Sequence, residues 1–191
     1  MIIHRWFSEV FYDEIYKPVR KLGTLKTVID LGSTCGEFSL WVYPQAEKIF
    51  AIEPHWGAFN HLAENVRDFP KIIPFFLAIA GENGHRGVYN EAIGDSSIAI
   101  PNDVGMVNVV KSQTLATFMK ENDIETVDCL KIDVESAEKE IFEAEDFPSV
   151  APKIKYIIGE DHQDNLNEVL PKLGFDYKRP SGHDFIARRK K

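Results

Sequence analysis

The feature that most constrains this chain is a repeated alternation between short apolar runs and longer segments with helical periodicity. The apolar runs are rich in β-branched residues and predict buried strands over residues 27–31, 48–53, 72–80, 127–134 and 154–160. Between these runs, apolar side chains recur every three or four positions and predict helices over residues 38–43, 56–66, 114–122, 136–145 and 165–173. Strands that alternate with helices in this way predict an α/β fold with a mainly parallel sheet and right-handed crossovers.

The end of the chain and one central segment depart from this alternation. Residues 175–178 and 185–187 flank a turn at 180–182, and they predict a C-terminal antiparallel hairpin. With the five runs above, the hairpin brings the predicted sheet to seven strands. Residues 81–110 are rich in Gly, Asn, Asp and Ser, and we expect one or two strands with loops at the sheet edge.

The N-terminal segment predicts a helix that precedes the sheet. Apolar residues at helical spacing cover residues 4–22, with an end or kink at Pro18 and a stop at Gly23. A length of 191 residues favours one domain, and no linker or internal repeat divides the chain. We therefore expect a single domain over residues 1–191, in which an N-terminal helix (1–23) precedes the α/β core (24–191).

Charge and composition exclude several classes of protein. The chain carries 22 Lys and Arg against 30 Asp and Glu, and this acidic balance argues against binding to nucleic acid or to an anionic membrane. No apolar stretch approaches the roughly 20 residues that a membrane-spanning helix needs. Two cysteines cannot make a disulfide framework, and their separation does not match paired zinc ligands. We expect a soluble cytoplasmic protein with no nucleic-acid partner and no membrane insertion.

The turn after the first predicted strand has the residue types of a cofactor-binding loop. Gly32 permits a tight turn, and Gly36 lets the next helix pack closely. Thr34 stands where a dinucleotide-binding motif needs its second glycine, and no Gly-Lys-Ser/Thr follows as in a phosphate-binding loop. A carboxylate at Asp30 would repel pyrophosphate, but it can accept hydrogen bonds from an ammonium group.

A second acid follows at the end of the second predicted strand. Glu53 lies 23 positions after Asp30, where an acid typically accepts hydrogen bonds from the two hydroxyls of a ribose. Together the two acids indicate a ligand with adenosine, an amino-acid end and no phosphates, which describes S-adenosylmethionine. The alternative interpretations are an ordinary tight loop at residues 30–36 and a solvated charge at Glu53.

Three segments resemble the motifs of a known family. Residues 28–36 (VIDLGSTCG) and 51–54 (AIEP) resemble the first two motifs of class I S-adenosylmethionine-dependent methyltransferases. Within that class, residues 131–138 (KIDVESAE) resemble the signature segment of the FkbM-type methyltransferases. The chain departs from this family at Ser136, where Gly is common, and at Ser33-Thr34, where Gly or Ala precedes Asn.

The resemblance implies a Rossmann-like class I methyltransferase fold, with a mainly parallel seven-stranded sheet and a C-terminal antiparallel hairpin. It implies an enzyme that transfers a methyl group from S-adenosyl-L-methionine to an acceptor hydroxyl. The residues that the motifs and the resemblance assign to cofactor binding are Asp30, Gly32, Ser33, Gly36, Glu53, Pro54, Ser97 and Asp133.

Transfer to a hydroxyl needs a base for the departing proton. The predicted catalytic residues follow the fourth and fifth strands and are His162, Glu135 and Asp133. His162 has an ordinary pKa of about 6.5, which suits a base at neutral pH. The alternative is a loop histidine held by Asp161 or Asp164, which would leave the base role to Glu135.

We predict no metal, and the alternative is a divalent cation held by the carboxylates of Asp133, Glu135 and Glu160. The expected acceptor is a saccharide or another small molecule with hydroxyl groups, because an acidic protein disfavours nucleic acid. Two further functions stay open at this point. One is an S-adenosylmethionine-binding protein without turnover, and the other is a nucleotide-dependent enzyme on a similar sheet.

Overall fold

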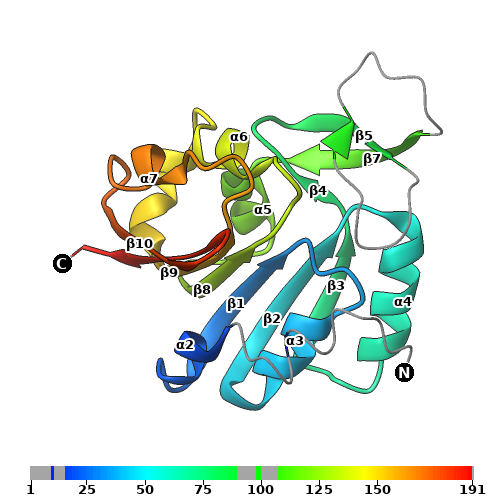
Figure 1. The fold of residues 1–191 in the computed structure, drawn as a ribbon. Helices are drawn as coiled ribbons and strands as arrows, with labels where there is room; N and C mark the ends of the chain where they lie inside the picture. Colours follow the sequence, from blue (N-terminus) through cyan, green and yellow to red (C-terminus); the bar gives the residue numbers. More distant parts are fainter. Residues whose placement is uncertain (1–9, 11–15, 90–97, 100–106, 191) are drawn as a thin grey trace.

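The computed structural model describes residue 10 and residues 16–89, 98–99 and 107–190. Its centre is a seven-stranded sheet with the order β10-β11-β9-β8-β1-β2-β3 (Figure 1). The five parallel strands are β1 (Leu25–Leu31), β2 (Ala46–Glu53), β3 (Ile72–Phe76), β8 (Val127–Ile132) and β9 (Ile154–Glu160). The hairpin of β10 (Phe175–Ser181) and β11 (Asp184–Arg189) adds an antiparallel pair next to β9. The predicted Rossmann-like fold is confirmed.

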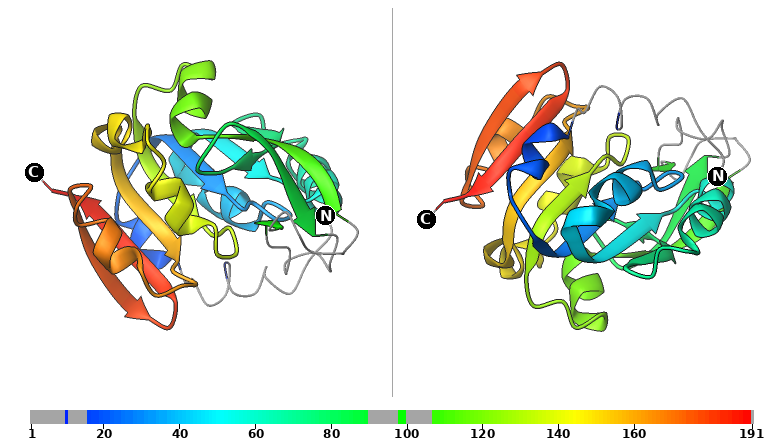
Figure 2. Two further views of the ribbon diagram at one scale, coloured as in Figure 1. Left: turned by 90° about the horizontal axis from the view of Figure 1, so that it is seen from above. Right: turned by 90° about the horizontal axis from the view of Figure 1, so that it is seen from below.

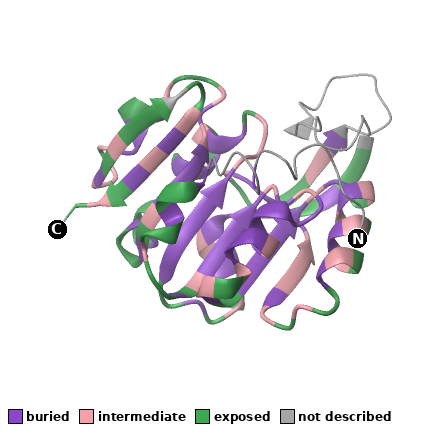
Figure 3. Cartoon of the chain, turned by 60° about the horizontal axis from the view of Figure 1, so that its bottom comes forward, coloured by how far each residue is buried: buried purple, intermediate pink, exposed green. Residues whose placement is uncertain are grey.

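Helices cover both faces of this sheet. One hydrophobic cluster joins the strands to α5 (Leu115–Glu121), α6 (Glu138–Phe142) and α7 (Leu166–Val169). The second cluster joins the opposite face to α2 (Lys17–Arg20), α3 (Glu37–Val42) and α4 (Trp56–Val66). Successive side chains of one strand alternate between the clusters, and Val28 and Ile29 are fully buried on opposite faces. Figure 3 shows the central strands buried almost throughout, as a parallel sheet requires.

Local signals set where the longer helices begin. The imidazole Nδ1 of His55 accepts a hydrogen bond from the N–H of Ala58 and caps α4 directly after Pro54. The hydroxyl of Thr114 accepts one from the N–H of Thr117 and caps α5. None of the helices in the described ranges is long and apolar enough to cross a membrane.

The third predicted strand divides between two sheets. The run at residues 72–80 breaks at Leu77, and its second part, β4 (Ala78–Ile79), joins a four-stranded sheet with β5 (Gly84–Tyr89), β6 (Ile98–Ala99) and β7 (Val107–Gln113). This second sheet and the hairpin lie at opposite ends of the molecule (Figures 1 and 2). The pairing of β3 with β2 continues through Pro74, because β3 is an edge strand whose outer side needs no hydrogen-bond donor.

Several other predicted boundaries also differ from the structure, and the helix expected over 165–173 covers only α7. The helix expected over 136–145 covers only α6, because Glu135 and Ser136 have positive φ angles of 51° and 80° that no α-helix contains. Pro18 lies in the first turn of α2, which begins at Lys17, and a first-turn residue needs no N–H donor. Most of the helix expected over residues 4–22 lies outside the described residues. The hairpin turn falls after Ser181, not at 180–182.

Strand order reverses between β1 and β8, which are neighbours in the sheet although about 100 residues separate them. From there the chain runs outward through β2 and β3 on one side and through β9 on the other. Ligands of open α/β sheets bind at this switch point, beyond the carboxyl ends of the strands.

Candidate active site

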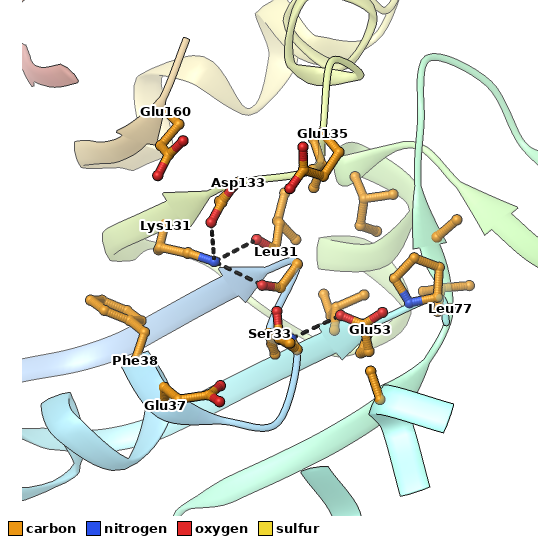
Figure 4. A pocket seen from close by; sticks show the side chains of 18 of the residues that line it. Leu31, Ser33, Glu37, Phe38, Glu53, Leu77, Lys131, Asp133, Glu135 and Glu160 are labelled. Carbon is orange, nitrogen blue, oxygen red and sulfur yellow. Dashed lines mark hydrogen bonds and ion pairs between the residues drawn. The ribbon is translucent and has the colours of Figure 1, made fainter. Parts of the chain in front are cut away.

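A cavity opens at the carboxyl ends of β1, β2, β8 and β9 (Figure 4). Its polar wall consists of Gly32, Ser33, Thr34, Glu37, Glu53, Lys131, Asp133, Glu135 and Glu160. Its apolar wall consists of Val10, Tyr16, Leu31, Phe38, Ile52, Pro54, Ala58, Val134 and four residues of the segment 77–88. The sequence-predicted residues Gly32, Ser33, Glu53, Pro54, Asp133 and Glu135 therefore line one cavity. Ser97 lies outside the described residues.

The two glycines of the first turn have different surroundings. Gly32 has a φ of 72°, and a Cβ there would lie 1.8 Å from the carbonyl oxygen of Asp133, so only glycine fits between β1 and β8. Gly36 has a φ of 96°, and a Cβ there would lie 2.9 Å from Leu62 of α4. Gly36 thus packs against α4 and, unlike Gly32, does not line the cavity.

Asp30 lies beneath the cavity and not on its wall. Its Oδ2 accepts a hydrogen bond of 2.6 Å from the hydroxyl of Ser39, and its Oδ1 lies 3.5 Å from Nζ of Lys131. The carboxylate that the motif offers to a ligand ammonium is therefore already held by two side chains of the protein.

Lys131 is one of the site residues that sequence reasoning missed. Its ammonium donates hydrogen bonds to the carbonyl oxygens of Leu31 and Gly32, and it lies 3.5 Å from carboxylate oxygens of both Asp30 and Asp133. Burial alone lowers the pKa of Lys131, but the carboxylates of Asp133 and Asp30 outweigh that effect and leave the pKa raised. Its position at the head of the KIDVE segment, inside a buried strand, was the available signal.

Glu53 stands in the cavity wall with its carboxylate fixed. Its Oε1 accepts the N–H of His55 at 2.7 Å, and its Oε2 accepts the N–H of Thr34 at 2.8 Å. Burial raises the pKa of Glu53 to about 7, although both backbone N–H groups oppose this shift. Each oxygen keeps a second lone pair, so the carboxylate can still accept two hydrogen bonds from a ligand.

At the far side of the cavity, His162 stands among carboxylates. Its Nε2 lies 3.3 Å from Glu160, 3.5 Å from Glu135 and 3.9 Å from Asp133, and its Nδ1 lies 2.8 Å from Oε1 of Glu138. Hydrogen bonds to Glu138 and Glu160 raise the pKa of His162 to about 11. The ordinary value that we expected for a base does not hold here, and His162 is positively charged at neutral pH.

Glu138 fixes the loop that carries the catalytic candidates. Its buried Oε1 accepts the N–H groups of Val134 and Ser136 in addition to its contact with His162. Glu138 was not among the predicted site residues, although it ends the KIDVESAE segment.

The alternative partners expected for His162 are engaged elsewhere. The carboxylate of Asp161 accepts the N–H groups of Asn165 and Leu166 and the hydroxyl of Tyr177. Asp164 instead forms an ion pair with Arg179. His162 therefore belongs to the cluster at the cavity and is not a loop residue satisfied by these two acids.

Part of this cluster could also hold a cation. Asp133, Glu135 and His162 each place one oxygen or nitrogen within 4.8 Å of the others. Two carboxylates and an imidazole are ligands that several divalent metals accept. Within the described residues this group consists of the three residues predicted for catalysis, and two of them, Asp133 and Glu135, line the cavity.

The sheet order, the cavity at the switch point and the acid at the end of β2 define a Rossmann-like α/β protein with a ligand site at the carboxyl ends of its strands. The model of the methyltransferase FkbM domain matches residues 36–186, and the chain belongs to this family. No curated protein matches the sequence.

Solved structures share the fold at low sequence identity. The FkbM methyltransferase of Methylobacillus flagellatus KT is 14% identical with a TM-score of 0.57, and the match covers 86% of this chain and 43% of that one. M. capricolum TrmK in complex with S-adenosylhomocysteine is 11% identical (TM-score 0.57; 93% and 68% covered). The precorrin-6y C5,15-methyltransferase of Geobacter metallireducens GS-15 is 14% identical (TM-score 0.54; 93% and 89% covered). The chain thus spans less than half of the FkbM relative.

Proposed function

We propose that this methyltransferase uses S-adenosyl-L-methionine to methylate a hydroxyl group of a saccharide or another small neutral molecule. The observation that carries the proposal is the carboxylate of Glu53. It is buried, held by two backbone N–H groups, and presented to the cavity next to the switch point. This geometry suits the two neighbouring hydroxyls of a ribose.

The residues of the cavity fit such a cofactor. Glu53 has free lone pairs for the ribose, and the apolar side chains of Leu77 and Ile79 offer a surface for the adenine ring. Gly32 lines the cavity, and its missing side chain lets the first turn lie directly against the backbone carbonyl of Asp133. The cofactor would supply an electrophilic methyl group on a sulfonium centre.

Glu135 is the base that we propose for the acceptor proton. Its side chain lines the cavity and is 39% exposed, and its Oε2 lies 3.5 Å from the charged imidazolium of His162. Burial and the neighbouring charge of Asp133 raise the pKa of Glu135, which makes it a stronger base than an ordinary carboxylate. His162 would orient this carboxylate, while Asp133 lies between the base and Lys131.

The acceptor class follows from the charge of the cavity wall. Asp133, Glu135 and Glu160 are hydrogen-bond acceptors, and they suit an acceptor that offers several hydroxyl donors. The same acids would repel the phosphates of a nucleic acid. A saccharide combines many hydroxyls with no negative charge, so it is the acceptor that these residues favour.

The test combines ligand binding with methyl transfer. A ligand at a concentration of 100 times its dissociation constant increases the free energy of unfolding by about 2.7 kcal/mol. S-adenosylhomocysteine at that concentration should therefore raise the melting temperature of the protein by roughly 5–10 °C. We expect no comparable shift with NAD or ATP. Incubation with methyl-labelled S-adenosylmethionine and a panel of saccharides should then label the acceptor.

A shift with NAD and none with the methionine derivative would contradict the proposal. The same assay tests the metal prediction, because we expect labelling to persist in EDTA. Activity that is lost in EDTA and restored only by Mg²⁺ or Mn²⁺ would assign a cation to Asp133, Glu135 and His162.

A further inference from the structure

Glu37, the first residue of α3, is a buried acid in the cavity wall that the proposed mechanism does not use. Only 6% of the residue is exposed. Its Oε2 accepts the N–H of Cys35 at 3.1 Å, whereas its buried Oε1 has no hydrogen-bond partner. An unpaired carboxylate oxygen away from water is costly, so such a group calls for a donor that the chain itself does not provide.

We propose that Glu37 binds the α-ammonium group of S-adenosylmethionine and thereby selects a cofactor with an amino-acid end. The inference rests on the proposed function and deepens it. It transfers to Glu37 the contact that the sequence motif favours for Asp30.

The other acceptors near Glu37 are paired or lie outside the cavity wall. Asp30 Oδ1 also has no hydrogen-bond partner, but it lies 3.5 Å from Nζ of Lys131, its Oδ2 accepts the hydroxyl of Ser39, and Asp30 does not line the cavity. The carbonyl oxygens of Leu31 and Gly32 both accept from the ammonium of Lys131. A cationic ligand group at the first turn therefore meets the free oxygen of Glu37.

The same turn positions both ligand-binding acids. The N–H of Thr34 donates to Glu53, and the N–H of the next residue, Cys35, donates to Glu37. Figure 4 shows the two carboxylates close to the turn that contains Ser33. One turn thus fixes an acceptor for ribose hydroxyls and an acceptor for a cation in a single cavity. A ligand that satisfies both must carry neighbouring hydroxyls and a cationic group, as S-adenosylmethionine does.

Two ligands separate the two contacts. S-adenosylhomocysteine has both the ribose and the ammonium, whereas 5′-methylthioadenosine keeps the adenosine thioether and lacks the amino-acid end. We would titrate the full chain with each ligand by calorimetry, using Glu37→Gln, Glu53→Gln and, as a matched control, Glu47→Gln, an exposed acid of β2.

Glu37→Gln should reduce the affinity for S-adenosylhomocysteine about 10- to 100-fold, which corresponds to the loss of a charge-assisted hydrogen bond. Its affinity for 5′-methylthioadenosine should not change. Glu53→Gln should reduce the affinity for both ligands, and Glu47→Gln should change neither affinity. Glu37→Asp keeps the negative charge, but its shorter side chain holds the carboxylate farther from the ligand. It should therefore reduce the affinity for S-adenosylhomocysteine by a smaller factor, and it provides the test if Glu37→Gln does not fold.

Two results would overturn the role of Glu37. One is unchanged binding of S-adenosylhomocysteine to both Glu37 variants, and the other is an equal loss for both ligands. Failure of the proposed function looks different, because the unmodified protein would then bind neither ligand.

Discussion

At the level of single residues, the buried Lys131 and the half-buried His162 decide how the acids of the cavity can act. Lys131 pairs with both Asp30 and Asp133, and Glu138 and Glu160 hold His162 in its charged form. Removing one partner of a buried ion pair costs roughly 3–5 kcal/mol, so these pairings are fixed features of the site. Glu37 and Glu53 line the cavity without pairing with either of these two cations.

Glu53 should make stability and cofactor affinity depend on pH in opposite directions. Its pKa is about 7 in the folded chain and about 4.5 when unfolded, so the fold favours the protonated form. That stabilisation is complete below pH 4.5 and is lost as the pH rises through 7. The unmodified protein should therefore lose up to about 3 kcal/mol relative to Glu53→Gln between pH 4.5 and 8.

Urea unfolding of both proteins at several pH values measures this difference. If the free energies of unfolding of the two proteins changed with pH in the same way, the result would contradict the raised pKa of Glu53. The ionised carboxylate accepts ribose hydroxyls better, so the affinity for S-adenosylhomocysteine should increase from pH 6 to 8. In Glu53→Gln the affinity should be lower and should not follow this titration.

The base is tested by comparing Glu135→Gln with His162→Gln. Loss of a general base typically lowers turnover 10²- to 10⁴-fold, and we expect this for Glu135→Gln with little change in cofactor affinity. His162→Gln removes a cation beside Glu135, which raises the pKa of that carboxylate further. The pH–rate profile of His162→Gln should therefore shift to higher pH, and its turnover should recover at alkaline pH. A loss at every pH in His162→Gln, with Glu135→Gln nearly as active as the unmodified protein, would return the base role to His162.

At the level of elements, the contact between the first turn and β8 creates the cavity floor. Gly32 meets the backbone carbonyl of Asp133 at a distance that no side chain tolerates. Lys131 reaches across the same contact to the carbonyl oxygens of Leu31 and Gly32. Strand pairing and ligand binding therefore depend on the same few atoms.

Gly32→Ala and Gly23→Ala separate crowding from backbone strain. Both glycines have positive φ angles, 72° and 74°, but a Cβ at Gly23 has no atom within 4 Å. Gly23→Ala should cost about 1–2 kcal/mol, the strain of a left-handed alanine. Gly32→Ala should cost at least about 3 kcal/mol, because β1 and β8 must also move apart. If urea unfolding showed the same loss of unfolding free energy in both variants, the chain would relieve the 1.8 Å contact between a Cβ at position 32 and the carbonyl oxygen of Asp133 without cost.

At the level of the whole molecule, the cavity joins parts of the chain that are far apart in sequence. Tyr16 comes from the segment before the sheet, and Glu53 and Glu160 follow strands on opposite sides of the switch point. Val88 comes from the second sheet. A sheet that brings the ends of β2, β8 and β9 together can therefore surround a ligand as long as an adenosyl amino acid.

The sequence by itself determined the strands, most helices, the hairpin and the acids that follow the strands. These features depend on local periodicity and on single residue types, which a chain displays without folding. The cavity-lining positions of Gly32, Glu53 and Glu135 follow in turn, because the carboxyl ends of parallel strands meet at one edge.

Only the tertiary structure decided which acids are free and which are paired. Lys131 reaches Asp30 because β8 lies beside β1, and Glu138 meets His162 from 24 residues away. The division of residues 72–80 between two sheets likewise depends on partners that arrive later in the chain. Charge state is set by distance and burial, and both come from strand order. Sequence spacing contains neither quantity, so Glu37 could be distinguished from Asp30 only after the chain had folded.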